Sequence, residues 1–234
     1  MIESISLFGA DVSLYYLFWF IGAVTVLILG CILGKDYGFA PARSILYVCG
    51  AIALGYLLLW GTSWVFGGGR VNGLNFIRIV IFMPIPVWIL TALFRDPFRK
   101  LADLVAPLLA IYHGVTHIGC IFAGCCHGYP SGWGFYSNEI EAICFPIQPI
   151  EAVSSIFIGA ILICMAKKEK HQGMLYPWYL FLFGSTRFLW EFFRDNEKIW
   201  YGISNLAFHA LAAAVIGLAA ILAVGFVQKR RPAL

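Results

Sequence analysis

The stretch LADLVAPLLAIYHGVTHIGCIF, residues 101–122, is an apolar run that ends in reactive polar side chains. A hydrocarbon core of ~30 Å takes about 20 helical residues to cross, and this run is long enough. Its last third enters HGVTHIGCIFAGCCHG, residues 113–128, which carries three histidines and three cysteines. Polar groups at membrane depth are costly and usually mark functional sites. We therefore predict a membrane helix whose end presents chemistry at the water boundary.

The composition of the whole 234-residue chain is that of an integral membrane protein. It is 61% hydrophobic and 12% charged, with a mean hydropathy of +0.85, whereas a soluble domain is ~25% charged. Seven stretches are apolar and long enough to span: 13–34, 43–66, 75–94, 101–122, 148–166, 174–193 and 204–227. Because lipid offers no hydrogen-bond partner to the backbone, we expect unbroken helices. The predicted fold is all-α, one domain over residues 1–234 with seven transmembrane helices.

Lysine and arginine predict the orientation. One set of loops holds Lys35, Arg43, Arg95, Arg99, Lys100, Lys167, Lys168, Lys170, Lys229, Arg230 and Arg231, and the other holds Arg70, Arg194 and Lys198. The positive-inside rule then places the N-terminus outside and the C-terminus in the cytoplasm. The loop at 123–147 faces outward. The net charge of +4 reports topology, and no nucleic-acid partner is expected.

The seven cysteines divide into two groups. Cys31, Cys49 and Cys164 lie in apolar stretches and are interpreted as packing residues. Cys120, Cys125, Cys126 and Cys144 lie at or beyond the outer boundary. If that side is oxidising, Cys144 could pair with Cys125 or Cys126.

A zinc site is the other use of these thiols. Cys120, Cys125, Cys126 and His127 are ligands that zinc accepts. Adjacent cysteines are awkward partners for one tetrahedral ion, however, and the chain has no CxxC motif. We expect neither a metal nor a cofactor.

Helical spacing aligns several of the polar residues. His113, His117 and Cys120 follow an i, i+4, i+7 pattern, and Asp103 falls within the same arc. The stripe is either a functional surface or a polar seam satisfied by neighbouring helices, with one histidine reaching the interface.

A second stripe, Arg187, Glu191 and Arg194, has the same spacing. Arg187 and Glu191 could form a local ion pair that offsets the cost of burial, with Arg194 near the water. Alternatively, Arg187 and Arg194 bind a lipid phosphate, for which guanidinium is well suited.

Four further residues have an ordinary reading beside a functional one. Gln148 and Glu151 follow Pro146 near the outer mouth, where they either cap a helix end or bind a polar headgroup. Arg78 is interpreted as reaching toward the interface. Tyr15 fits an interfacial aromatic belt or a headgroup contact.

These segments, in this order, resemble the bacterial prolipoprotein diacylglyceryl transferase family from Tyr15 to Arg194. LADLVAP (101–107) looks like the family's pre-motif helix. HIGCIFAGCCHG (117–128) occupies the place of R-I-G-N-F-x-N-G-E-x-x-G. FPIQPIE (145–151) is similar to H-P-[ST]-Q-L-Y-E, and GSTRFLWEFFR (184–194) to G-x-x-R-F-x-[VI]-E-x-x-R. Seven spans with an outward N-terminus also agree with that family.

The resemblance implies transfer of a diacylglyceryl group from phosphatidylglycerol to a lipobox cysteine thiol at the outer leaflet of a bacterial inner membrane. The chain departs from the family where the acid–base groups lie. Counting back from Asp103 without gaps puts the family's essential histidine at Ile77. His117 replaces the signature arginine, Cys120 and Ala123 replace its asparagines, and Cys125 replaces its glutamate. The chain therefore looks like a divergent paralogue of the family.

The leading hypothesis is a phospholipid-dependent transferase. Catalytic candidates are a base (His113 or His117), a thiol that carries the lipid transiently (Cys125 or Cys126) and Glu191. Substrate-binding candidates are Tyr15, Asp103, Gln148, Glu151, Arg187 and Arg194, and the acceptor is a lipobox peptide or a small thiol. The alternatives are a thiol–disulfide protein that uses Cys120, Cys125, Cys126 and Cys144, and a lipid-binding protein without catalysis.

Overall fold

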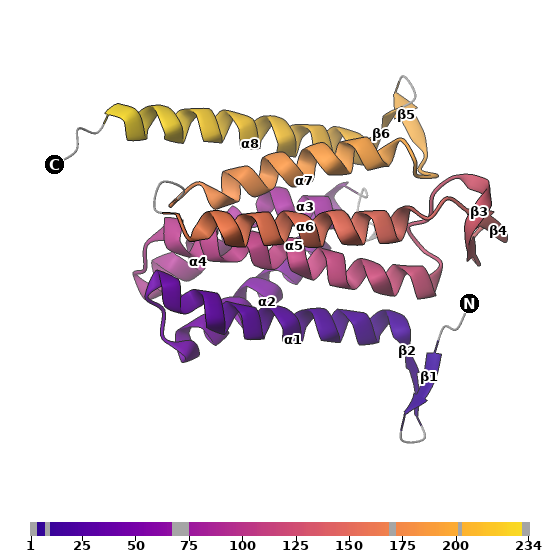
Figure 1. The fold of residues 1–234 in the computed structure, drawn as a ribbon, viewed down its shortest axis with the longest axis horizontal. Helices are drawn as coiled ribbons and strands as arrows, with labels where there is room; N and C mark the ends of the chain where they lie inside the picture. Colours follow the sequence, from indigo (N-terminus) through magenta and orange to yellow (C-terminus); the bar gives the residue numbers. More distant parts are fainter. Residues whose placement is uncertain (1–3, 8–9, 67–74, 169–171, 201–202, 231–234) are drawn as a thin grey trace.

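The computed structural model describes residues 4–7, 10–66, 75–168, 172–200 and 203–230. Within these residues, eight α-helices form a bundle (Figure 1): α1 (Leu14–Gly34), α2 (Pro41–Phe66), α3 (Phe76–Phe82), α4 (Pro84–Phe94), α5 (Phe98–Ala123), α6 (Ile147–Ala166), α7 (Leu175–Glu191) and α8 (Asn205–Arg230). A 3-10 turn, η1 (Lys35–Tyr37), follows α1. The described chain is thus mostly helical, as predicted.

Three two-stranded antiparallel hairpins lie at one end of the bundle. They are β1 (Ser4–Leu7) with β2 (Ala10–Ser13), β3 (Pro130–Ser137) with β4 (Ala142–Cys144), and β5 (Lys198–Trp200) with β6 (Ile203–Ser204). Their registers pair Ser4 with Ser13, Tyr136 with Ile143, and Lys198 with Ser204. Each hairpin leads into or out of a helix near the candidate site.

All seven predicted stretches are helical, but fewer than seven pass as membrane spans. Five helices of the described chain are long and apolar enough to cross, and a sixth span results if α3 and α4 are counted together. α7 has only 17 residues and carries buried charges. The structure therefore supports an all-α membrane protein with five or six candidate spans.

The expectation of unbroken helices is wrong for 75–94. α3 and α4 meet at a bend of 45°, where α3 ends at Phe82 and α4 begins at Pro84. Proline has no backbone N–H to donate to the preceding turn and clashes with it, so the first helix ends there. Phe76 at the start of α3 contacts α5, where its ring centroid lies 4.6 Å from that of His113.

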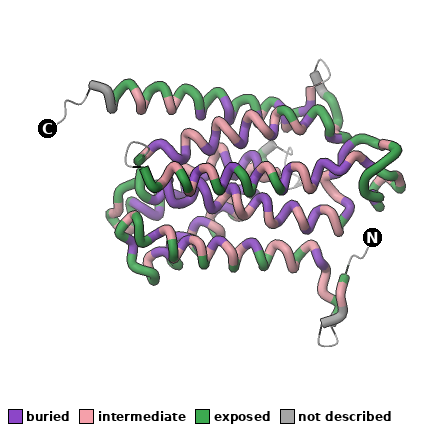
Figure 2. Tube along the Cα trace, viewed as in Figure 1, coloured by how far each residue is buried: buried purple, intermediate pink, exposed green. Residues whose placement is uncertain are grey.

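α5 is the central helix of the bundle. Figure 2 shows it as mostly buried along its length, while α1 and α8 alternate with exposed positions on their outer faces. The exposed positions of α1 and α8 include many large apolar side chains, such as Phe20, Ile28 and Leu222. This distribution suits a bundle surrounded by lipid, in which polar groups gather inside.

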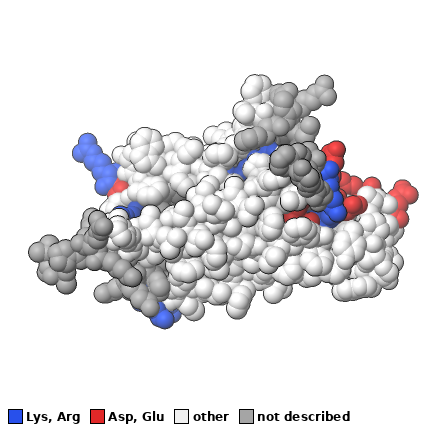
Figure 3. Space-filling view, turned by 90° about the horizontal axis from the view of Figure 1, so that it is seen from above, with Lys and Arg blue, Asp and Glu red and all other residues white. Residues whose placement is uncertain are grey.

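Charged side chains gather mostly toward the two ends of the face seen in Figure 3, with uncharged surface between them. Arg43, Arg95, Arg99 and Lys100 lie where α2 and α5 begin and α4 ends. Arg70, Lys170 and Arg231, which also entered the orientation argument, lie outside the described residues. Arg78 is buried, with 6% of its surface exposed, so the expectation that it reaches toward the interface is wrong.

Candidate active site

A cavity of about 510 Å³ lies at the hairpin end of the bundle. Its polar lining comes mainly from α5, from the loop after α5, and from the end of α7 and the segment that follows it, with Tyr15 of α1 and Asn75 before α3. Its members include Tyr15, Asn75, His113, Thr116, His117, Cys120, Cys125, Cys126, His127, Glu139, Arg187, Arg194, Asp195 and Asn196. The structure thus brings together His113, His117 and Cys120 of the first predicted stripe with Arg187 and Arg194 of the second.

Two glycines of α5 set the helix spacing at this cavity. A Cβ built on Gly114 would lie 2.8 Å from the Ala152 carbonyl oxygen of α6. A Cβ on Gly119 would lie 3.1 Å from the Tyr15 carbonyl oxygen of α1. Absence of side chains therefore lets α6 and α1 approach α5 closely. This approach places Glu151 and Tyr15 beside the α5 stripe.

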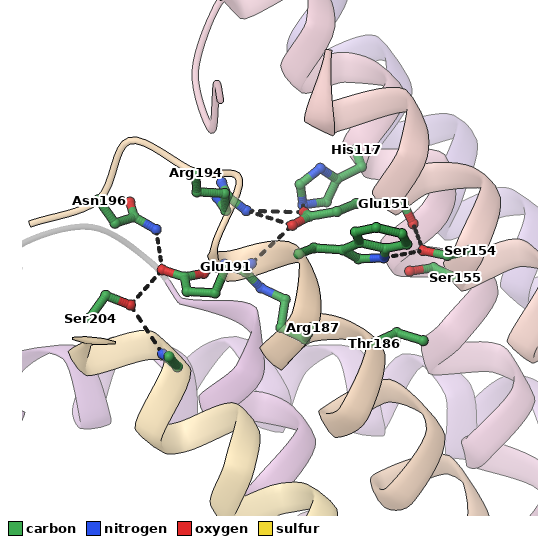
Figure 4. A network of polar contacts seen from close by, with 12 residues as sticks. His117, Glu151, Ser154, Ser155, Thr186, Arg187, Glu191, Arg194, Asn196 and Ser204 are labelled. Carbon is green, nitrogen blue, oxygen red and sulfur yellow. Dashed lines mark hydrogen bonds and ion pairs between the residues drawn. The ribbon is translucent and has the colours of Figure 1, made fainter. Parts of the chain in front are cut away.

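Glu151 is the centre of a buried charge network (Figure 4). Only 1% of it is exposed. Its carboxylate accepts hydrogen bonds from Arg187 Nη1 at 2.9 Å and from Arg194 Nη1 at 3.0 and 3.1 Å. His117 Nε2 lies 3.2 Å from the same carboxylate. Two guanidinium groups and one carboxylate thus share a site where low dielectric strengthens each contact.

Glu191 supplies a second carboxylate, which pairs with Arg187. Its Oε2 lies 2.7 Å from Arg187 Nη1, the i, i+4 ion pair that the sequence spacing offered as one of two interpretations. Its Oε1 accepts hydrogen bonds from Ser204 Oγ at 2.6 Å and from Asn196 Nδ2. Asn196, in the loop before β5, and Ser204, in β6, therefore tie the end of α7 to the β5–β6 hairpin.

The placement of Arg194 near water is wrong. Arg194 follows α7, yet it is buried, with 7% of its surface exposed. Burial alone lowers the pKa of its guanidinium, but the adjacent Glu151 carboxylate outweighs this and raises it. Arg194 is therefore a fixed positive charge facing the cavity.

The two imidazoles of the α5 stripe pack against each other with their ring planes tilted by 50°. The ring centroids of His113 and His117 are 4.4 Å apart, and Phe76 and Phe183 contact His113. His113 Nδ1 lies 2.8 Å from Ser155 Oγ of α6. His117 Nδ1 is buried and has no hydrogen-bond partner among the described residues. His117 is 7% exposed, so the reading in which a histidine reaches the interface is wrong for both.

Three thiols meet beside these imidazoles. The chain turns after α5 through Gly124, with φ 69°, and Cys126, with φ 57°. This turn brings Cys125 and Cys126 back to Cys120. Hydrogen bonds from the Cys120 and Cys125 thiols, together with the charge of Arg194, hold the pKa of the Cys126 thiol well below its ordinary value. Each of the seven cysteines is described and is a free thiol, so the Cys144 disulfide considered from sequence is absent from this structure.

Asp103 is not brought to the cavity. It accepts hydrogen bonds from the backbone N–H groups of Gly173 and, at 3.0 Å, Leu175. It therefore caps the start of α7 at the far end of the bundle. The helical arc was read correctly, but ten residues advance a helix by about 15 Å. A shared face did not mean a shared depth.

Gln148 and Tyr15 have different relations to the cavity. Gln148 is buried, with 2% of its surface exposed, and its Nε2 donates to the Cys125 carbonyl oxygen at 3.1 Å. It holds the loop after α5 in place. Tyr15 lines the cavity directly.

Ser155 and Ser204 were missed by sequence reasoning. Ser155 lies four residues after Glu151 and therefore on the same helix face. That spacing was the available signal. Ser204 reaches Glu191 only through the β5–β6 hairpin, which the sequence pattern did not predict.

An apolar crevice adjoins the polar cavity. It has a volume of about 80 Å³ and lies among α1, α2, α3 and α5, with Val48, Met83 and Leu108 in its lining. Trp19, Leu59, Phe76 and Thr116 line both spaces. A polar chamber and an apolar slot therefore share one wall, an arrangement that suits an amphipathic ligand.

Comparison with known proteins identifies the group to which this chain is related. The family model for prolipoprotein diacylglyceryl transferase matches residues 4–225. The chain belongs to the prolipoprotein diacylglyceryl transferase family. This match favours a transferase over the redox and binding-only alternatives.

Individual relatives carry the same description. The phosphatidylglycerol–prolipoprotein diacylglyceryl transferase 2 of Clostridium perfringens is 34% identical over 106 residues, 42% of this chain and 41% of the relative. The transferase of Clostridium tetani is 29% identical over 51% of each chain. The Chlorobaculum tepidum transferase is 27% identical over 67% of this chain and 63% of its own length. The chain therefore spans less than two thirds of these relatives.

Ile77 marks a position where this chain departs from the rest of the prolipoprotein diacylglyceryl transferase family. It occupies the place where the resemblance puts the family histidine, and it lines the polar cavity. The neighbouring Phe76 ring centroid lies 4.6 Å from that of His113. An imidazole is thus present beside this position, but it comes from α5 rather than from α3.

Proposed function

We propose that this chain transfers the diacylglyceryl group of phosphatidylglycerol to the thiol of a lipobox cysteine. The observation that carries the proposal is the pair Arg187 and Arg194 in a polar cavity that adjoins an apolar crevice. The names of the relatives supply the substrates. We further propose seven membrane spans, with the N-terminus and the cavity facing outward from a bacterial inner membrane.

The two arginines would bind the phosphodiester and the departing phosphate. Arg194 Nε is buried and has no hydrogen-bond partner among the described residues. Its free N–H would meet a phosphate oxygen, while Glu151 keeps both guanidinium groups in position. Preorganised positive charge lowers the barrier because it does not have to reorganise as charge develops on the leaving group.

The apolar crevice would receive part of an acyl chain. Its lining is almost wholly aliphatic and aromatic, and burial of each CH₂ contributes ~0.8 kcal/mol. Tyr15, which lines the cavity, would contact the headgroup or the glycerol. Gln148 supports this region through the Cys125 carbonyl.

We assign proton acceptance to His113. Its contact with Ser155 fixes the ring, and its side chain lines the cavity. In the reaction the acceptor thiol gives its proton to the imidazole, and the thiolate sulfur bonds to the glyceryl carbon. The carbon–oxygen bond to phosphate breaks with its electron pair on oxygen, so glycerol phosphate leaves. Thiolate is the reactive form, and the base supplies it.

Intact-mass spectrometry tests the proposal. Purified protein is incubated with phosphatidylglycerol and a lipobox peptide, and the expected product is a peptide heavier by one diacylglyceryl group. A peptide with serine at the acceptor position is the control. His113→Ala should slow transfer by about 10²–10⁴-fold, whereas His209→Ala, on α8 outside the cavity lining, should not. If the peptide remains unmodified although phosphatidylglycerol is present, the proposed reaction is rejected.

The same spectra test a covalent route through Cys125 or Cys126. In that route the protein itself gains the diacylglyceryl mass, and Cys125→Ser or Cys126→Ser abolishes the gain. A modified peptide with an unmodified protein would instead mean direct transfer. Replacing the peptide with a small thiol shows whether the acceptor must be a lipobox sequence.

A further inference from the structure

The turn after α5 places a histidine nitrogen and two cysteine sulfurs together at the cavity wall. Ligand atoms of His117, Cys120 and Cys126 all lie within 4.8 Å of one another. Ligands of a tetrahedral zinc ion, with bonds of about 2.0–2.3 Å, are about 3.3–3.8 Å apart. Closing the three ligands around an ion therefore needs shifts of about an ångström. We propose that His117, Cys120 and Cys126 bind one Zn²⁺ ion.

His117 is already oriented as a metal ligand. Its Nε2 lies 3.2 Å from the Glu151 carboxylate, so Nε2 carries the proton and Nδ1 presents its lone pair. Nδ1 is the buried nitrogen with no partner among the described residues. A carboxylate behind a ligating histidine fixes the tautomer and raises its basicity, which is the usual outer contact of zinc sites. Arg187 and Arg194 fix the Glu151 carboxylate in this position beside His117.

The backbone answers the objection that adjacent cysteines do not suit one ion. Cys126 has a φ of 57°, a left-handed conformation that is uncommon outside glycine. This conformation turns Cys126 toward Cys120, and His117 lies one helical turn before Cys120. Strained backbone that persists at a cavity wall is a reason to look for a function there. The second sulfur reaches the site through this turn rather than through a CxxC motif.

The surrounding charge balances the site. Two thiolates neutralise Zn²⁺, and Arg194 lies against the Cys126 sulfur. Three protein ligands leave a fourth position, which is the pattern of catalytic rather than structural zinc. All three line the cavity, so an ion would have an entry path from the space where the substrate is proposed to bind.

That fourth position gives the ion a role that rests on the proposed function. A thiol that coordinates zinc is deprotonated outright. The acceptor cysteine would bind there as thiolate, with its proton passed to His113, before attacking the glyceryl carbon. Zinc would thus help to form the thiolate in a chain that has Ile77 at the position of the family's histidine.

Metal analysis of the purified full-length protein tests the site without any lipid. The protein is incubated with Zn²⁺ and the excess is removed by gel filtration. Inductively coupled plasma mass spectrometry should then give about one Zn²⁺ per chain. Cys120→Ser, Cys126→Ser and His117→Ala should each lower this to near zero. Cys164→Ser, at an exposed position on α6, is the matched control and should retain the ion. Cys125→Ser should also retain it, since Cys125 is outside the three-ligand set.

Cobalt gives a second readout that does not depend on variants. Co²⁺ bound by two thiolates should show the sulfur-to-metal charge-transfer band and strong tetrahedral d–d bands. Adding a lipobox peptide should shift these bands, and a serine peptide should not. Two results together would overturn the site: a mild chelator removes Zn²⁺ equally from wild type and Cys126→Ser, and the cobalt protein shows no sulfur-to-metal charge-transfer band. Peptide lipidation by metal-free protein at the full rate would overturn the role but leave the transferase proposal intact.

Discussion

Glu151 is the residue on which the buried charges of the site depend. Its one carboxylate compensates Arg194 and shares Arg187 with Glu191. Removing one partner of a buried charge network is strongly destabilising, because it leaves a charge in low dielectric without compensation. The position therefore links stability to activity.

Glu151→Gln should lower the free energy of unfolding by about 3–5 kcal/mol. Thermal unfolding in detergent, followed by circular dichroism, would show this as a clear fall in Tm. Glu139→Gln is the matched control, because the Glu139 carboxylate is 66% exposed and, among the described residues, pairs with His127 at 3.5 Å. Equal Tm values for the two variants would contradict the central role of Glu151.

At this scale the sequence predicted pairs within one helix and missed pairs between helices. The spacing of Arg187 and Glu191 indicated their contact, and the structure has it. Glu151 was recognised as a candidate, but its bonds to both arginines depend on how α6 packs against α7, which no local spacing encodes. Asp103 shows the converse, since a correct helix face gave no information about depth.

At the scale of elements, the approach of α5 to α6 holds the site together. Gly114 is the point of closest packing, where an added Cβ would lie 2.6 Å from Ile156 Cγ1 and 2.8 Å from the Ala152 carbonyl oxygen. Backbone cannot yield as a flexible side chain does. The α6 residues that face His113 and His117 are therefore held by a glycine that touches no substrate.

Gly114→Leu should force the two helices apart. We expect a loss of about 1–3 kcal/mol from overpacking, and a larger loss of transferase activity because His117 would leave Glu151. Gly61→Leu, on α2 with no atom within 4 Å of an added Cβ, is the comparison. Stability by thermal unfolding and product by peptide mass would be measured for both. A Gly114→Leu protein with unchanged activity would show that this spacing is unimportant.

The helix pattern was predictable because apolar periodicity and length leave few alternatives in lipid. Seven stretches were expected and seven regions are helical, although 75–94 is divided at Pro84. The hairpins were not predicted, because their strands are at most eight residues long and lie in Gly- and Pro-rich connections. These hairpins nevertheless position Glu139 and Ser204.

At the scale of the whole molecule, α1 begins at the hairpin end and α8 ends at the opposite end (Figure 1). An odd number of crossings requires this arrangement. The described helices are therefore compatible with seven spans, provided that α7 crosses the membrane and that α3 and α4 together form one span. α7 is short, but a Cβ on its Gly184 would lie 2.5 Å from Ala214 N of α8. Protein rather than lipid therefore surrounds much of its length, and its charges pair internally.

The positive-inside rule then predicts which end faces out. An epitope tag inserted at Gly132, in the β3–β4 hairpin where an added Cβ meets no atom within 4 Å, should bind antibody in intact spheroplasts. A tag after Lys168, following α6, should bind only after the membrane is permeabilised. The reverse pattern would place the cavity in the cytoplasm, where the proposed acceptor would be the cysteine of a precursor not yet exported. Accessibility of both tags without permeabilisation would mean that an even number of spans separates them, so that α6 does not cross the membrane.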